Sequence, residues 1–147
     1  MDSTATHQID IDAPPEKVFP VAADPESQLR WDHAGIITVE KVTPGPLTQG
    51  SRYRGRWKRF GRMEYTFAAY DPPRRFTHDA ATFLGRMIHT YTLEAVDEGT
   101  RFGQHLELIE PNLIGKLTRP MTGPIMHRRL AQIGAELKAH IEAHPQR

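Results

Sequence analysis

Two side chains suited to proton transfer lie two residues apart in one alternating segment. Within residues 86–96, Met87, His89, Tyr91 and Leu93 alternate with more polar positions. Alternate residues of a strand face the same side, so the imidazole and the phenol are expected to project together. Imidazole titrates near neutral pH, and a phenol can donate to a carbonyl or enolate oxygen. The pair therefore predicts a proton donor and a proton acceptor on one face of a strand.

Other catalytic signatures are missing from the sequence. No acid or second histidine is recognisably paired with His89, so a structural role for it stays open, and His78 is a weaker candidate because its strand face is undefined. The chain has no cysteine, which excludes thiolate metal sites and cysteine nucleophiles. His140 and His144 have a spacing that can chelate, but no His-Glu-x-x-His, glycine-rich phosphate loop or Gly-x-Ser-x-Gly occurs. We expect no metal and no cofactor.

A set of mostly apolar and aromatic side chains falls on the predicted inward faces of the strands. Such a lining with a few polar groups is typical of a small-molecule pocket. The alternative is that these residues fill a core, which we favour for Phe67. Asp32 and His33 follow Trp31 near the expected pocket mouth, where we favour a surface loop pair over residues that gate or contact a ligand. The predicted ligand contacts are Tyr53, Trp57, Tyr65, Phe67, His89, Tyr91, Phe102 and Gln104 on the strands, and Leu117 and Met121 on the C-terminal helix.

The elements that must position these side chains follow from the periodicity. Short turns separate most of the period-two segments, which is the pattern of an antiparallel meander. The seven predicted strands cover residues 7–12, 35–42, 51–60, 63–70, 75–82, 86–96 and about 102–108.

Helical patterns flank the predicted strands. Pro14-Pro15-Glu16 opens a helix that Pro20 should shorten or kink, and a second short helix runs from Asp24 to about Trp31. Near the C-terminus, Leu113, Leu117 and Met121 lie at intervals of four. The residues Met126, Leu130, Ile133, Leu137 and Ile141 then step by 4, 3, 4 and 4, which predicts an amphipathic helix that covers the concave face of the sheet. Pro120 and Pro124 predict a kink or break near residues 120–124.

The order of these elements resembles the helix-grip fold of the START-like superfamily, also called SRPBCC, whose small bacterial members are often named polyketide cyclase/dehydrase-like proteins. The matching segments are Ile9-Asp10-Ile11-Asp12-Ala13-Pro14-Pro15-Glu16-Lys17-Val18-Phe19, Ala23-Asp24-Pro25 with Trp31-Asp32, Tyr70-Asp71-Pro72-Pro73-Arg74-Arg75-Phe76, and Tyr91-Thr92-Leu93-Glu94 with Gly99-Thr100-Arg101.

The resemblance implies one domain over residues 1–147 with an α+β helix-grip fold. In that fold a curved, seven-stranded antiparallel sheet surrounds a long C-terminal helix, and two short helices follow the first strand. It also implies that a hydrophobic or aromatic small molecule, lipid-, polyketide- or sterol-like, binds between the sheet and that helix. A polyketide cyclase, aromatase or dehydratase that uses His89 and Tyr91 is the alternative, because fold identifies activity poorly.

The charge distribution supplies a third hypothesis. The chain of 147 residues has a net charge of +1, yet residues 51–75 hold eight bases and two acids. Arg52, Arg54, Arg56 and Lys58 alternate with other residues, so we favour a solvated strand face over a nucleic-acid footprint. An interaction module whose basic strand 52–58 meets an acidic partner stays open. We further expect a cytoplasmic protein with no membrane span and no nucleic-acid partner, either a monomer or a dimer.

Overall fold

The computed structural model describes residues 4–144 and has the expected α+β helix-grip architecture. The alternating segments form strands because their apolar positions face one side, and the C-terminal apolar stripe forms a helix. The elements are β1 (Thr4–Ile11), α1 (Pro15–Ala23), α2 (Pro25–Trp31), β2 (Ile36–Lys41), β3 (Arg52–Trp57), β4 (Gly61–Asp71), β5 (Arg75–Thr82), β6 (Gly85–Val96), β7 (Gly99–Pro111), α3 (Leu113–Leu117) and α4 (Arg119–Ala143).

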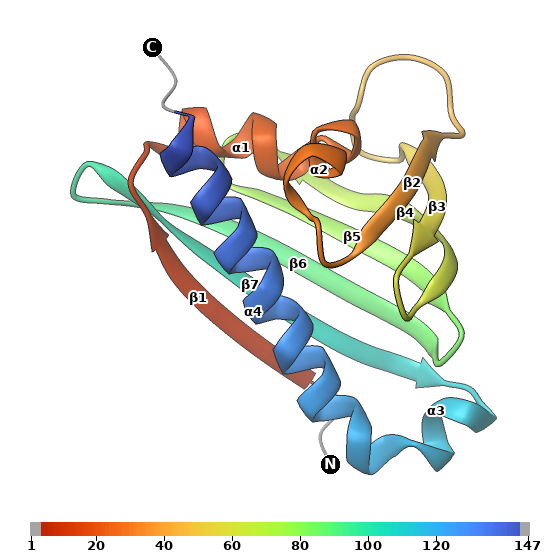
Figure 1. The fold of residues 1–147 in the computed structure, drawn as a ribbon. Coiled ribbons are helices and arrows are strands. Elements are labelled where there is room, and N and C mark those ends of the chain that lie inside the picture. Colours follow the sequence, from red (N-terminus) through yellow and green to blue (C-terminus); the bar gives the residue numbers. More distant parts are fainter. Residues whose placement is uncertain (1–3, 145–147) are drawn as a thin grey trace.

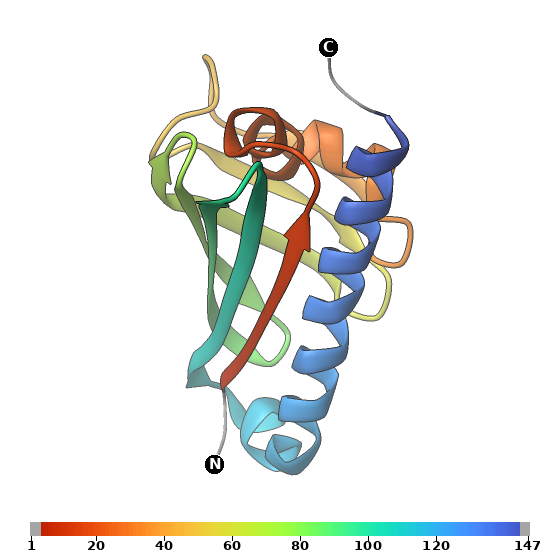
Figure 2. The same cartoon turned by 90° about the vertical axis from the view of Figure 1, so that its left-hand side faces the viewer.

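One antiparallel sheet contains all seven strands, in the order β1-β7-β6-β5-β4-β3-β2. Six strands follow one another as a meander, and β1 pairs with β7 at one edge. Figure 1 shows α4 crossing one face of the curved sheet, with α1 and α2 near one end of it. Figure 2 shows α4 standing off that face, with β1 running beside it. The inward residues of the strands are therefore enclosed between the sheet and α4.

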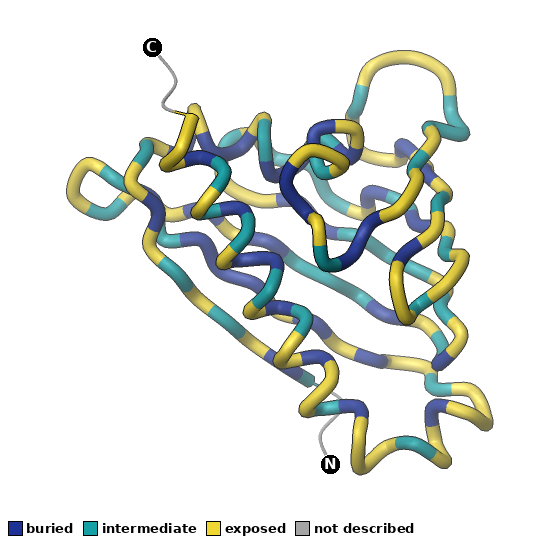
Figure 3. Tube along the Cα trace, in the orientation of Figure 1, coloured by how far each residue is buried: buried dark blue, intermediate teal, exposed yellow. Residues whose placement is uncertain are grey.

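Buried residues gather between the sheet and the helices (Figure 3). One cluster joins Phe19 of α1, Phe76 of β5 and Leu137 of α4, all buried. A second cluster joins Met126 and Leu130 of α4 to the ends of β6 and β7. Each cluster buries apolar surface that favours folding, and together they fix α4 over the sheet at two levels.

The prolines shorten or interrupt helices at positions close to those predicted. Pro20 lies inside the nine-residue α1, which stays short. The break before the long helix falls at Thr118, slightly ahead of the predicted region 120–124, because Pro120 occupies the first turn of α4, where a missing N–H costs little. Pro124 is accommodated inside α4. In the described residues, no helix is both long and apolar enough to cross a membrane.

Candidate functional site

A cavity of about 90 Å³ lies between the sheet and α4. Inward residues of β3, β4, β5, β6 and β7 line it, together with Gln28 of α2 and with Arg129 and Ile133 of α4. An apolar cavity of about 150 Å³ accommodates a benzene ring, and pockets for drug-sized ligands measure about 300–1,000 Å³. Any ligand of the size of a benzene ring or larger must therefore displace side chains.

A chain of hydrogen bonds runs through the cavity wall from β6 to α4. Nε2 of Gln104 donates to the carbonyl oxygen of Leu130 (2.9 Å), which fixes the orientation of the amide. Oε1 of Gln104 therefore faces His89 as an acceptor, at 3.1 Å from Nε2. The proton of the neutral imidazole must then be on Nε2, so Nδ1 accepts from the Tyr91 hydroxyl at 3.0 Å. Tyr91, His89 and Gln104 thus form one directional chain.

Burial keeps the two groups of the predicted catalytic pair neutral. It lowers the pKa of His89 well below 6.5, and the neighbouring His78 and Arg129 act in the same direction. Burial also raises the pKa of Tyr91 above its usual value, so the phenol stays protonated. The pair is therefore held as a neutral hydrogen-bonding unit at physiological pH.

Tyr65 and His78 contribute two buried polar atoms to the same cavity. Their rings lie 4.5 Å apart between centroids, and both residues line the cavity. Neither the Tyr65 hydroxyl nor Nε2 of His78 has a hydrogen-bond partner among residues 4–144. Burial lowers the pKa of His78 to about 3 and raises that of Tyr65 well above its usual value. Both groups are neutral, and both are able to pair with a ligand.

A buried ion pair joins the cavity wall to α2. Arg129 donates from Nη1 to Oδ1 of Asp32 at 2.8 Å and from Nη2 to Oδ2, and Gln28 also donates to Oδ2 at 2.7 Å. Burial by itself would raise the pKa of Asp32, but the hydrogen bonds and charge of Arg129 hold it below its usual value. The prediction of a surface pair was wrong for Asp32, which is 1% exposed because it is the counter-ion of Arg129. His33 is exposed.

Five of the predicted ligand contacts belong to the cavity or its hydrogen-bond chain. Trp57, Tyr65, His89 and Tyr91 line the cavity, and Gln104 is hydrogen-bonded to His89. Tyr53, Phe67 and Phe102 are buried in the core cluster and are not among the residues that line this cavity.

The prediction for Leu117 and Met121 was wrong. They are 73% and 57% exposed and lie outside the cavity. A step of four back from Met126 reaches Thr122, which is 2% exposed and continues the buried stripe, whereas Met121 is one position out of register. Leu117 belongs to α3, beyond the break at Thr118.

Sequence reasoning missed Arg129 and underrated His78. Arg129 follows Met126 by three positions and precedes Ile133 by four, so helical spacing already placed it on the inner side of α4. His78 alternates with the buried Phe76 on β5, which places both side chains on the inward face.

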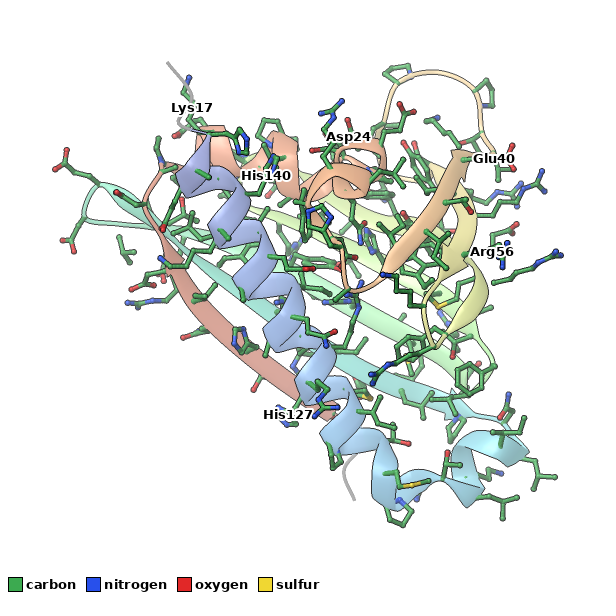
Figure 4. All side chains as sticks on the ribbon, viewed as in Figure 1. Lys17, Asp24, Glu40, Arg56, His127 and His140 are labelled. Carbon is green, nitrogen blue, oxygen red and sulfur yellow. The ribbon has the colours of Figure 1, made fainter. Side chains whose placement is uncertain are left out.

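The basic strand β3 presents its charged side chains to solvent, as predicted. Arg52, Arg54 and Arg56 of β3 and the following Lys58 are exposed, and Figure 4 shows Arg56 projecting outward from the sheet. Arg54 pairs with Glu40 at 2.9 Å, and Nζ of Lys58 donates to the carbonyl oxygen of His33 at 2.8 Å. An acidic partner for this strand stays a prediction. No group of three or more potential metal ligands gathers within residues 4–144.

Comparisons with known proteins add a family and a fold. A family model described as polyketide cyclase/dehydrase and lipid transport matches residues 3–142. A search of curated proteins found no match.

Three solved structures illustrate the similarity of fold. The Zhui aromatase/cyclase from a Streptomyces species has a TM-score of 0.76 at 15% identity, with 97% of this chain and 95% of that chain covered. Protein MLL2253 from Mesorhizobium loti has a TM-score of 0.75 at 15% identity, with coverage of 97% and 99%. TTHA0849 from Thermus thermophilus has a TM-score of 0.72 at 21% identity, with coverage of 97% and 99%.

Proposed function

The chain belongs to the polyketide cyclase/dehydrase and lipid transport family, and from that premise we propose that it binds a neutral, mainly apolar or aromatic small molecule between the sheet and α4. The observation that carries the proposal is the pair of unpartnered polar atoms in one cavity, the Tyr65 hydroxyl and Nε2 of His78. A buried polar group without a partner costs stability, and a ligand oxygen or hydroxyl would remove that cost.

The charge of the cavity favours a neutral ligand over a carboxylate or an amine. Its two histidines are neutral, and the tyrosines stay protonated. The one cationic side chain in the wall, Arg129, is already neutralised by Asp32. A charged ligand would therefore lose its hydration without gaining a free counter-ion.

The volume of the cavity constrains how such a ligand fits. Because about 90 Å³ is less than a benzene ring requires, a polyketide-, lipid- or sterol-sized molecule needs space from movable side chains. Met63 and Met87 line the cavity, and methionine changes rotamer at low cost because it is unbranched. We expect these two side chains to move when ligand binds.

Thermal denaturation with matched ligand pairs tests the proposal. A series of neutral aromatic ketones and phenols is compared with carboxylates of the same ring size. A native-state ligand at one hundred times its Kd raises the free energy of unfolding by about 2.7 kcal/mol. We expect the neutral series, but not the carboxylates, to raise Tm. The proposal fails if no neutral compound stabilises the protein or if the carboxylates stabilise it equally.

Native mass spectrometry of freshly purified protein provides a second test, because a copurifying neutral molecule would identify the ligand class directly. Recovery of an organic acid instead would contradict the expected neutral chemistry.

A cyclase or dehydratase activity is the second candidate, and the Tyr91–His89–Gln104 chain favours it. A substrate hydroxyl or enol that donates to the Tyr91 oxygen would pass a proton through the phenol to Nδ1 of His89. We rank this function second because burial makes His89 a weak base. The substitutions His89→Ala and Tyr91→Phe should then remove turnover of a cyclisable substrate in folded protein, and unchanged product distribution in both variants would reject these roles.

A further inference from the structure

An exposed apolar surface lies at the end of the molecule formed by α3, the start of α4 and the β5–β6 turn. Gly115 packs against the backbone of Leu84 in this turn, and the Asn112 amide donates to the carbonyl oxygen of Phe83. Met126, in the third turn of α4, is fully buried. The inner side of residues 112–126 therefore packs against the rest of the protein, while the outer side is also apolar. We call this outer face the apolar tip: Phe83, Leu113, Ile114, Leu117, Met121 and Ile125, between 44% and 73% exposed.

The charged side chains of the segment that carries most of the apolar tip are of one sign. Lys116, Arg119 and Arg128 are exposed, and no acidic residue occurs from residue 111 to residue 135. The preceding acid, Glu110, is paired with Arg86 at 3.4 Å. Exposed apolar side chains interleaved with lysine and arginine are the pattern of segments that lie in the interface of an anionic bilayer.

We propose that the apolar tip docks on an anionic lipid bilayer. The apolar side chains enter the headgroup region, while the three cations contact lipid phosphates. A second copy of the chain fits this surface poorly, because a two-fold contact would bring the cations of both copies together. Figures 1 and 2 show α3 and the start of α4 projecting beyond the ends of most of the strands, a shape suited to a flat surface.

The apolar tip also continues into the cavity wall. Phe60 lines the cavity, and its ring lies 6.0 Å from that of Phe83 between centroids. A bilayer at the apolar tip would therefore lie beside the Phe60 end of the cavity. The docking itself does not depend on the ligand proposal, because it is measured without ligand.

Vesicle flotation tests the proposal. The protein is floated with vesicles of phosphatidylcholine alone or of phosphatidylcholine mixed with phosphatidylglycerol. We expect binding to the mixed vesicles only. Each lysine or arginine near an anionic surface contributes about a fivefold factor in affinity, so K116Q/R119Q should weaken binding about 25-fold. L113S/L117S should weaken it at least about tenfold, since each leucine loses its apolar transfer energy.

A matched control carries the same types of substitution at the opposite end of the molecule. L29S/K17Q changes one exposed leucine and one exposed lysine on α2 and α1, and Figure 4 shows Lys17 far from α3. This variant should bind as wild type does. The proposal is overturned if the mixed vesicles float no protein, if L113S/L117S binds normally, or if L29S/K17Q loses binding to the same extent. Association with an acidic protein in place of vesicles would likewise overturn it.

Discussion

Replacement of Tyr65 by phenylalanine removes a buried hydroxyl that has no partner among the described residues and keeps the ring in its place. The ring packs against Tyr53, Trp57 and His78, and these contacts do not involve the hydroxyl. An unsatisfied buried hydroxyl costs about 1–3 kcal/mol. Tyr65→Phe should therefore increase the free energy of unfolding by about that amount, with a rise in Tm of about 3 °C for each kcal/mol.

Tyr91→Phe is the matched control, because it removes a hydroxyl that is already bonded. The Tyr91 hydroxyl donates to Nδ1 of His89 at 3.0 Å, and the substitution leaves that nitrogen unpaired. A loss of about 1–2 kcal/mol is expected. Urea denaturation of wild type and both variants at pH 7 gives the two differences under one condition. If Tyr65→Phe destabilises the protein as Tyr91→Phe does, the hydroxyl is a structural group and the reasoning is wrong.

The same substitution should weaken ligand binding. A ligand that pairs with the Tyr65 hydroxyl gains a hydrogen bond worth about 0.5–1.5 kcal/mol, so its loss should weaken affinity about two- to tenfold. Isothermal titration with a neutral ligand found by thermal denaturation measures this change. Greater stability combined with weaker binding is the expected result, and unchanged affinity would remove Tyr65 from the ligand site.

Three further outcomes follow from the buried charges and the packing. Arg129→Met should lower the free energy of unfolding by about 3–5 kcal/mol at pH 7, because Asp32 stays buried without its cation. In this variant burial raises the pKa of Asp32, so the loss measured by urea denaturation should shrink as the pH falls toward 4 and Asp32 is protonated. A loss that does not change with pH would contradict this reasoning. Because the pKa of His78 falls to about 3 on folding, His78 should contribute a loss of about 1.4 kcal/mol per pH unit below about pH 6.5, and His89, whose pKa is also lowered, adds to this slope. His78→Phe should reduce the slope by the contribution of His78. Leu130→Ala should cost about 2–5 kcal/mol, whereas Leu117→Ala, at a side chain 73% exposed, should stay within about 0.5 kcal/mol in thermal denaturation.

The sheet could be predicted because its strands carry a clear period of two. The alternation in β6 places Met87, Tyr91 and Leu93 on the buried face, as expected. Local irregularities could not be predicted in the same way. A bulge between Ile36 and Thr38 leaves Ile37 exposed at 45%, because an added residue turns the following side chains to the other face.

The candidate site was predictable in part because neighbours on one strand share a face. His89 and Tyr91 met this condition, but their partner did not come from the same strand. Gln104 lies opposite Tyr91 across β6 and β7, in the register that begins at the turn pair Val96 and Gly99. What the sequence does not reveal is how the side chains of His89 and Gln104 orient toward each other across the two strands. The ion pair of Asp32 with Arg129 joins residues 97 positions apart and depends on α4 lying beside α2.

Two buried polar groups in the cavity lower the stability of the fold, and they are the main basis for the proposed ligand site. Folded proteins pair nearly all their buried polar groups, so two unpartnered atoms, Tyr65 Oη and His78 Nε2, in one cavity demand a reason. Two phenylalanines there would fill similar space without that cost. A ligand with one polar atom would satisfy such a site while its apolar remainder contacts Met63 and Met87. Binding would then recover free energy that the unliganded fold gives up, at a position where packing alone favours apolar rings.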